Sequence, residues 1–232
     1  MRRTSIEKPT YRIRRSGRPP AFSGDWSEGV WAAAEALRVD HFHAASSEHR
    51  PEVQAKLLYD DACLYVIFRV RDRYVRAVIE EYQGPVCTDS CVEAFLQPGG
   101  RGGYFNFELN CCGTLLLYYI EDPRRTEEGF VRSTSVAPEH AADIRIYHSM
   151  PDRVDPEIAE AVQWRVEYGI PFDLFEAYIG NRLDFRKTAT WRGNFYKCGD
   201  KTSHPHWASW SPIGEELNFH CPQYFGVLEF EV

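Results

Sequence analysis

The chain lacks the features of a membrane protein and of a secreted disulfide protein. No apolar run approaches the ~20 residues that a bilayer-spanning helix needs. The basic N-terminus is not followed by the apolar segment of ~7–15 residues that a secretory signal would show. The seven cysteines are an odd number, and no two of them have CxxC spacing. We therefore expect reduced thiols and a cytoplasmic location, or secretion if the true start carries a leader that this sequence has lost.

Outside the N-terminus, the chain has no excess of basic residues. The net charge is −7, although residues 1–20 hold seven Arg or Lys and a single acid. An acidic body does not suit a nucleic-acid groove, since such a groove must neutralise phosphates. We interpret residues 1–21 as a basic, partly extended leader, and we expect neither nucleic-acid binding nor membrane insertion.

Methionines are few, at two, whereas aromatic residues make up 14% of the chain. Short runs of alternating polarity separated by turn residues favour strands over helices. We expect an all-β, antiparallel, jelly-roll-like β-sandwich with one or two short helices, built as a single domain over residues 22–232. The expected elements are a hairpin over 53–72 that turns at Asp60–Asp61, strands over 88–98, 104–110, 113–120, 142–149, 163–171, 188–199 and 224–232, a helix over 172–178, and a loop over 121–129.

Alternation along three of these strands predicts the core. Large apolar side chains occupy every second position, so that they share one face of each strand. The predicted core residues are Leu64, Val66, Phe68, Val70, Val92, Leu96, Phe107 and Leu109.

The opposite face of two neighbouring strands is polar. "TDSCVEAFLQP" and "YFNFELN" each place acids or amides where a second core face would be apolar. Since paired strands lie ~4.8 Å apart, these side chains can form one patch suited to hydrogen-bonding hydroxyl groups. They are Asp89, Glu93, Asn106 and Glu108. A simply solvated sheet face is the other interpretation.

A second group follows near the C-terminus, in "WRGNFYKCGDKTSHPHWASW". Aromatic rings beside an amide and charges suit a sugar, which presents C–H patches to rings and hydroxyls to polar groups. The candidates there are Asn194, Tyr196, Lys197 and Trp207.

The order of these segments resembles the family 9 carbohydrate-binding modules, and more closely their free-standing family 9-like relatives. The resemblance covers residues 22–232 through "LLYDDACLYVIFRVRD", "DSCVEAFLQP", "YFNFELNCCGT", "WRVEYGIPF" and "RGNFYKCGD…HWASWSPI…NFHCPQYFGVLEF". It implies a sandwich of two antiparallel sheets related to the DOMON superfamily, a site in which two aromatic rings clamp a terminal sugar, and calcium away from that site. Tyr82 stands where the family has its first clamp residue. Asp60, Asp61 and Asp72 are the candidate calcium ligands.

The function expected is non-catalytic carbohydrate binding, with a carbohydrate-active enzyme as a candidate partner. Three alternatives stay open. Asp89, Glu93 and Glu108 could serve a glycoside hydrolase or an accessory subunit of one. The chain could also be a haem-binding DOMON-type domain. Late-chain Cys and His residues could bind zinc, although their spacing is not that of a structural site.

Overall fold

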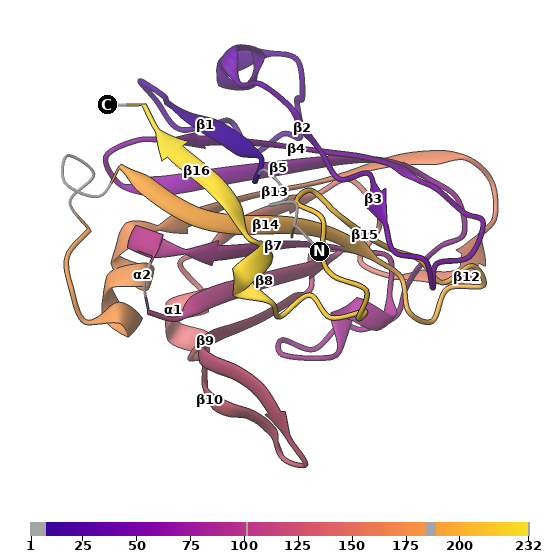
Figure 1. The fold of residues 1–232 in the computed structure, drawn as a ribbon. Helices are drawn as coiled ribbons and strands as arrows, with labels where there is room; N and C mark the ends of the chain where they lie inside the picture. The colour runs from indigo at the N-terminus through magenta and orange to yellow at the C-terminus, as the bar shows by residue number, and fades with distance from the viewer. Residues whose placement is uncertain (1–7, 101, 184–188, 232) are drawn as a thin grey trace.

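The computed structural model describes residues 8–100, 102–183 and 189–231, and these form two packed β-sheets (Figure 1). The first sheet has the strand order β10-β9-β8-β7-β14-β16, with β15 and β3 beyond β14. The second has the order β4-β5-β13-β11, with β2 on β4. The predicted all-β, largely antiparallel sandwich is therefore confirmed.

The strand bounds follow the alternating runs closely. In the first sheet they are β3 (His41–Phe42), β7 (Cys91–Gln97), β8 (Tyr104–Asn110), β9 (Leu115–Thr126), β10 (Gly129–Ser135), β14 (Thr190–Cys198), β15 (Trp207–Ser209) and β16 (Gly226–Phe230). In the second they are β2 (Leu37–Arg38), β4 (Glu52–Tyr59), β5 (Cys63–Asp72), β11 (Arg145–His148) and β13 (Val162–Pro171). A separate pair joins β6 (Val75–Ala77) and β12 (Val154–Ile158).

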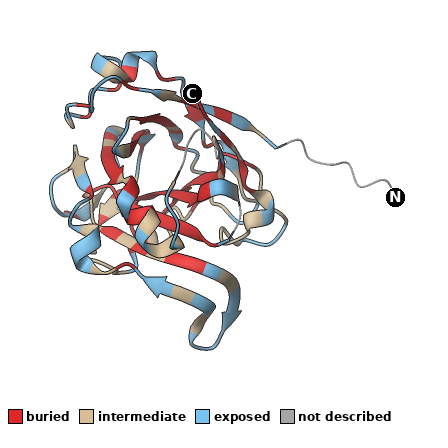
Figure 2. Cartoon of the chain, turned by 90° about the vertical axis from the view of Figure 1, so that its left-hand side faces the viewer, coloured by how far each residue is buried: buried red, intermediate tan, exposed pale blue. Residues whose placement is uncertain are grey.

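The core lies between the two sheets, where Figure 2 shows most of the buried backbone. All eight predicted core residues belong to one buried cluster. Contacts across the sandwich join β5 to β14 through Phe68 and Phe195, whose ring centroids are 6.2 Å apart. Phe107 and Tyr168 join β8 to β13 at 6.3 Å. The period-2 pattern therefore assigned the inward faces correctly.

Strand β1 (Thr10–Arg15) corrects the predicted domain boundary. It runs parallel to β16 through Ile13↔Phe230 and parallel to β4 through Arg15↔Tyr59, so that it connects the two sheets. Ile13 is fully buried. The sandwich thus begins near residue 10 and not at residue 22, because Tyr11 and Ile13 alternate with the arginines that gave this stretch its basic character. Residues 1–7 of the predicted leader lie outside the described residues.

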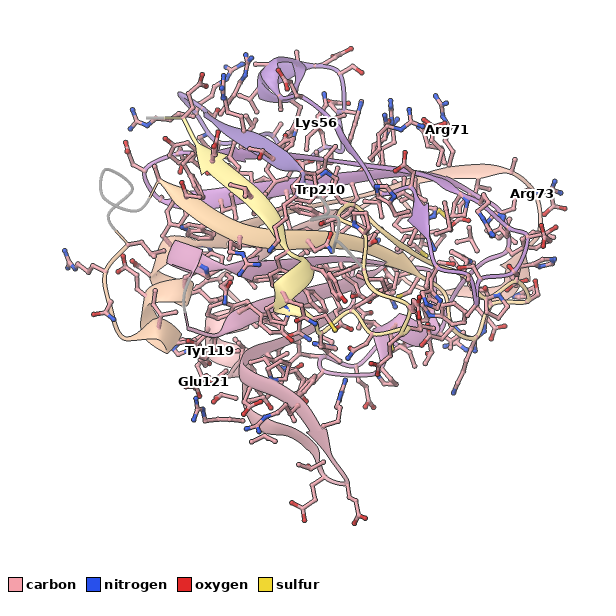
Figure 3. The ribbon with its side chains drawn as sticks, in the orientation of Figure 1. Lys56, Arg71, Arg73, Tyr119, Glu121 and Trp210 are labelled. Carbon is pink, nitrogen blue, oxygen red and sulfur yellow. The ribbon has the colours of Figure 1, made fainter. Side chains whose placement is uncertain are left out.

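The prediction of a loop over residues 121–129 is also corrected, because β9 continues to Thr126 and pairs with β10. Figure 1 shows this hairpin projecting from the sandwich, and Figure 3 labels Tyr119 and Glu121 near its base. Tyr119 is buried, whereas Glu121 forms an ion pair with Arg132 of β10 at 3.1 Å. Charged side chains on both strands concealed the alternation, because residues 121–129 are exposed or only partly buried.

Helical structure is limited to short segments. The predicted helix is present as α2 (Phe172–Ile179), and α1 (Pro138–Ala141) is a single turn. Helix α2 buries Phe172, Leu174 and Phe175 against the sandwich. Within the described ranges, no helix is both long enough and apolar enough to cross a bilayer.

Candidate functional site

A pocket of about 290 Å³ opens on the outer face of the first sheet. Its floor comes from β7, β8 and β14, and its walls from the segment after β14, the segment before β16 and the β9–β10 hairpin. The lining residues, which define the pocket from here on, are Cys87, Glu93, Glu108, Arg125, Cys198, Asp200, Trp207, Leu217, Asn218, Phe219 and His220.

Two glutamates form the centre of the floor. Glu93 of β7 and Glu108 of β8 are directly paired across the strands, and they are only 2% and 6% exposed. Directly opposite residues on one sheet face have Cβ atoms about 4.5–5.5 Å apart, so these side chains are neighbours. Glu93 Oε1 accepts a hydrogen bond from the Cys198 thiol at 3.1 Å, and Glu108 Oε1 accepts one from the Asn106 amide at 2.8 Å.

Aromatic side chains form two of the walls. The Trp207 indole nitrogen donates to Asp200 Oδ1 at 2.7 Å, which fixes the ring beside the acidic floor. Phe219 stacks on Tyr196, with ring centroids 4.1 Å apart and an interplanar angle of 12°. Tyr196 is fully buried and donates its hydroxyl to the Phe219 carbonyl at 2.9 Å. The walls are therefore attached to the sheet by specific contacts.

The acids of the pocket have raised pKa values. Burial, and then the neighbouring Glu108, raise the pKa of Glu93 well above its usual value. Burial raises the pKa of Glu108 to about 7, and burial also raises the pKa of Asp200. Burial lowers the pKa of His220 to about 3, so this imidazole is neutral.

This carboxyl pair should make stability depend on pH. A carboxyl group with a raised pKa stabilises the folded state while it is protonated, and this contribution is lost as the pH rises through the folded-state pKa. We expect Glu108→Gln to match the wild type in free energy of unfolding near pH 5 and to exceed it by on the order of 2 kcal/mol at pH 8. Denaturant unfolding of both proteins at each pH measures the difference. The comparison with the variant cancels His220, whose lowered pKa acts in the opposite direction, and a constant difference would contradict the prediction.

The pocket brings together part of the predicted site. Glu93, Glu108 and Trp207 line it. Tyr196 and Asn106 lie behind the lining, where they support Phe219 and Glu108. Asn194 is on the same sheet face but fully buried, and its amide bonds to the backbone of Ser211 at 2.9 and 2.8 Å, which holds the segment after β15 in place.

Three predicted site residues lie elsewhere. Tyr82 donates its hydroxyl to the Val136 carbonyl at 2.8 Å and lines a different cavity. Asp89 is fully buried and accepts bonds from Arg76, Asn110 and the backbone of Val78, so its oxygens are occupied. Neither side chain lies over the pocket floor, although both residues are close in sequence to β7.

Lys197 is the third. It alternates with Tyr196 along β14 and therefore points between the sheets, where it is fully buried. Its Nζ lies 2.7 Å from His206 Nε2 and 3.5 Å from Asp72 Oδ2. The sequence interpretation grouped Tyr196 and Lys197 because they are adjacent in the chain, but they lie on opposite faces of β14.

The three candidate calcium ligands do not fit a calcium site. Asp60 accepts bonds from the Ala62 and Cys63 backbone and from the Tyr65 hydroxyl, so it closes the β4–β5 turn. Asp61 is exposed and pairs with Arg15. Asp72 has the Lys197 ammonium group beside it, in the place that a cation would need.

The late-chain Cys and His residues do not converge on one zinc site. His206 lies between the sheets beside Lys197, whereas His220 and Cys198 line the pocket. Two groups of potential ligand atoms within 4.8 Å of one another do occur among the described residues: His49, Asp72 and His206, and Cys91, Glu93 and Cys198. The first group already holds the Lys197 ammonium group. In the second, burial raises the pKa of the Cys91 thiol, and the hydrogen bond with Cys91 and then burial raise the pKa of the Cys198 thiol.

Sequence reasoning missed most of the walls. Asp200 follows β14 directly, and Phe219 and His220 lie in a long segment without alternation. Arg125 belongs to the hairpin that was interpreted as a loop. If residues 121–126 had been predicted as a strand, Arg125 could have been identified as a pocket residue. Residues 217–220 line the pocket through tertiary contacts, which no local sequence pattern indicates.

Fold and pocket together give a β-sandwich with an acidic, aromatic-walled pocket on one sheet face. The chain matches Carbohydrate-binding family 9 over residues 31–230, and it belongs to this family. Comparison with curated proteins gives no match.

Solved structures agree with this assignment. A protein of Bacteroides uniformis ATCC 8492 named for carbohydrate binding is 30% identical, with a TM-score of 0.82 over 97% of this chain and 100% of that one. Two structures of a family 9 carbohydrate-binding module from Caldicellulosiruptor kristjanssonii share the fold. The complex with cellotriose is 14% identical, with a TM-score of 0.59 over 96% of this chain and 94% of that one. The complex with glucose is 16% identical, with a TM-score of 0.54 over 95% of both chains.

Proposed function

We propose that this chain is a non-catalytic carbohydrate-binding protein and that the pocket floored by Glu93 and Glu108 takes one end of a glycan. The observation that carries the proposal is the Trp207 ring held beside two buried carboxyl groups in a family 9 chain. Carboxyl oxygens accept bonds from sugar hydroxyls, while an aromatic face packs against the C–H side of the ring. A volume of about 290 Å³ is near the lower limit of ligand pockets, which favours one or two sugar rings.

Two substitutions test this site. Trp207→Ala removes the aromatic wall and Glu93→Ala removes an acceptor of charged hydrogen bonds, each of which contributes ~1.5–3 kcal/mol. We expect each variant to weaken saccharide binding at least tenfold, measured by calorimetry on a ligand found in a glycan panel. Tyr82→Ala is the control, because Tyr82 lines the other cavity. If only Tyr82→Ala lost binding, the site would lie at Tyr82, where the family resemblance places the first clamp residue, and not in the pocket.

A glycoside hydrolase is the second candidate, since a Glu108 pKa of about 7 suits a general acid. Asp89 cannot take part, because its oxygens are bonded to Arg76, Asn110 and the backbone. Release of the aryl group from aryl glycosides, lost in Glu93→Gln, would favour the hydrolase. A role beside a carbohydrate-active enzyme, membership of the DOMON superfamily and a cytoplasmic location stay proposals. The absorption spectrum of the purified protein tests the haem alternative.

A further inference from the structure

The carboxyl groups of the pocket floor can accept more hydrogen bonds than the protein donates to them. Each glutamate accepts one hydrogen bond through Oε1, and the other oxygen of each carboxyl group accepts none from any described residue. Both side chains line the cavity and are at least nine-tenths buried. Neither oxygen is among the buried atoms that lack a partner, so both are open to the cavity, and a ligand that displaces water there must donate to both.

The cations of the protein compensate this acidic floor only in part: burial raises the pKa values of Glu93 and Glu108, and Lys197 and Arg125, which act to lower them, do not outweigh it. Arg125 is exposed, and its guanidinium group lies 3.7 Å from the centroid of the Phe130 ring. Lys197 is on the opposite face of β14, bonded to His206. His220 is neutral, and Asp200 adds a third carboxyl group to the lining. The thiols stay protonated, because burial raises the pKa of Cys87, and the hydrogen bond with Cys91 and then burial raise the pKa of Cys198.

A neutral sugar cannot balance the charge of ionised carboxyl groups, so it would leave the floor protonated. Hydroxyl groups donate one bond each, and the sugar excludes the water that solvates the carboxylates. A protonated primary amine offers three donors and a positive charge. The attraction between unlike charges is strongest where water is excluded.

We propose that the ligand is a sugar that carries a protonated amino group, with the ammonium group placed between Glu93 and Glu108. This inference rests on the proposed function and specifies the ligand class of the same pocket. Trp207 and Phe219 would enclose the remainder of the ring.

Two β-1,4-linked disaccharides provide a matched test on the full chain: the glucosamine dimer and cellobiose, which differ in carrying an amino or a hydroxyl group at carbon 2. We expect calorimetry at pH 7 to show at least tenfold tighter binding of the glucosamine dimer. Binding of the amine should also release protons from the carboxyl pair, visible as a dependence of the measured heat on the buffer. Cellobiose should release none.

Glu108→Gln keeps the shape of the floor and removes one charge, so it should abolish the tenfold preference, and a preference that persists in this variant would contradict the inference. Glu216→Gln is the control, since this acid is exposed in the neighbouring segment. Equal binding of both disaccharides, or tighter binding of cellobiose, would overturn the inference and leave carbohydrate binding intact. Binding of neither, with other glycans bound in the panel, would also overturn it. A panel without any bound glycan would overturn the proposed function itself.

Discussion

Replacing Asp72 with Ala is expected to lower the free energy of unfolding by about 3–5 kcal/mol. The reason is the buried ammonium group that would lose its counter-ion. Lys197 and the Asp72 carboxylate have fully buried side chains, and Asp72 also accepts bonds from His49 at 2.7 Å and Trp164 at 3.2 Å. Urea unfolding at pH 7 measures the change.

The effect should decrease in acid. Burial acts to raise the pKa of Asp72, but Lys197, His49 and His206 together hold it well below its usual value. A carboxyl group with a lowered pKa stabilises the fold above its unfolded-state pKa of about 3.9, and this contribution is lost as the pH falls towards the folded-state value. The difference between wild type and Asp72→Ala should therefore diminish below about pH 4.

Two further variants separate charge from packing. Asp61→Ala removes an exposed partner of Arg15 and should change stability by less than about 1 kcal/mol. Adding Lys197→Met to Asp72→Ala removes the unpaired charge and should recover part of the loss. If Asp72→Ala costs no more than Asp61→Ala, the Asp72–Lys197 contact does not stabilise the sandwich.

Replacing Phe107 with Ala is expected to cost about 3–5 kcal/mol, because it opens a cavity in the centre of the core. Phe107 is fully buried, with ring centroids 5.8 Å from Phe175 and 6.3 Å from Tyr168. It therefore joins β8 both to the opposite sheet and to α2.

Thermal and urea unfolding of Phe107→Ala measure this cost. Val131→Ala is the matched control, because Val131 lies on β10 and is 48% exposed. It should change stability by less than about 0.5 kcal/mol. A cost below about 1 kcal/mol for Phe107→Ala would mean that neighbouring side chains fill the space and that the sheets pack less tightly than described.

Alternation predicted the faces of the sheets well, because one side of each strand is in contact with the core. It failed where that contact is absent or different. The β9–β10 hairpin projects away from the sandwich, and its residues 121–129 are exposed or only partly buried. In β1 the apolar positions are few and stand among arginines, so charge dominated the pattern. Lys197 shows the reverse case, since a charged residue occupies a core position and is balanced by Asp72.

The pocket was harder to predict than the sheets. Glu93 and Glu108 were found because a polar side chain at a repeating position of a strand is conspicuous. The walls depend on segments that fold over the sheet from distant parts of the chain. Trp207 meets Asp200 through its indole nitrogen, and Phe219 meets Tyr196 face to face. Local sequence propensity contains no information about such tertiary contacts. Only the high aromatic content of the segment from residue 191 to 210 indicated a site there.

Strand β1 has a consequence for the order in which the molecule can be assembled. It pairs with β16 near the end of the chain and with β4 of the other sheet. The junction between the sheets therefore depends on contacts between the first and the last strands, which are the most distant in sequence and the slowest to close. Until β16 emerges from the ribosome, β1 lacks its partner in the first sheet, and β14 exposes an edge that can pair with another chain. A nascent chain without β16 is thus the form of this protein most exposed to misassociation.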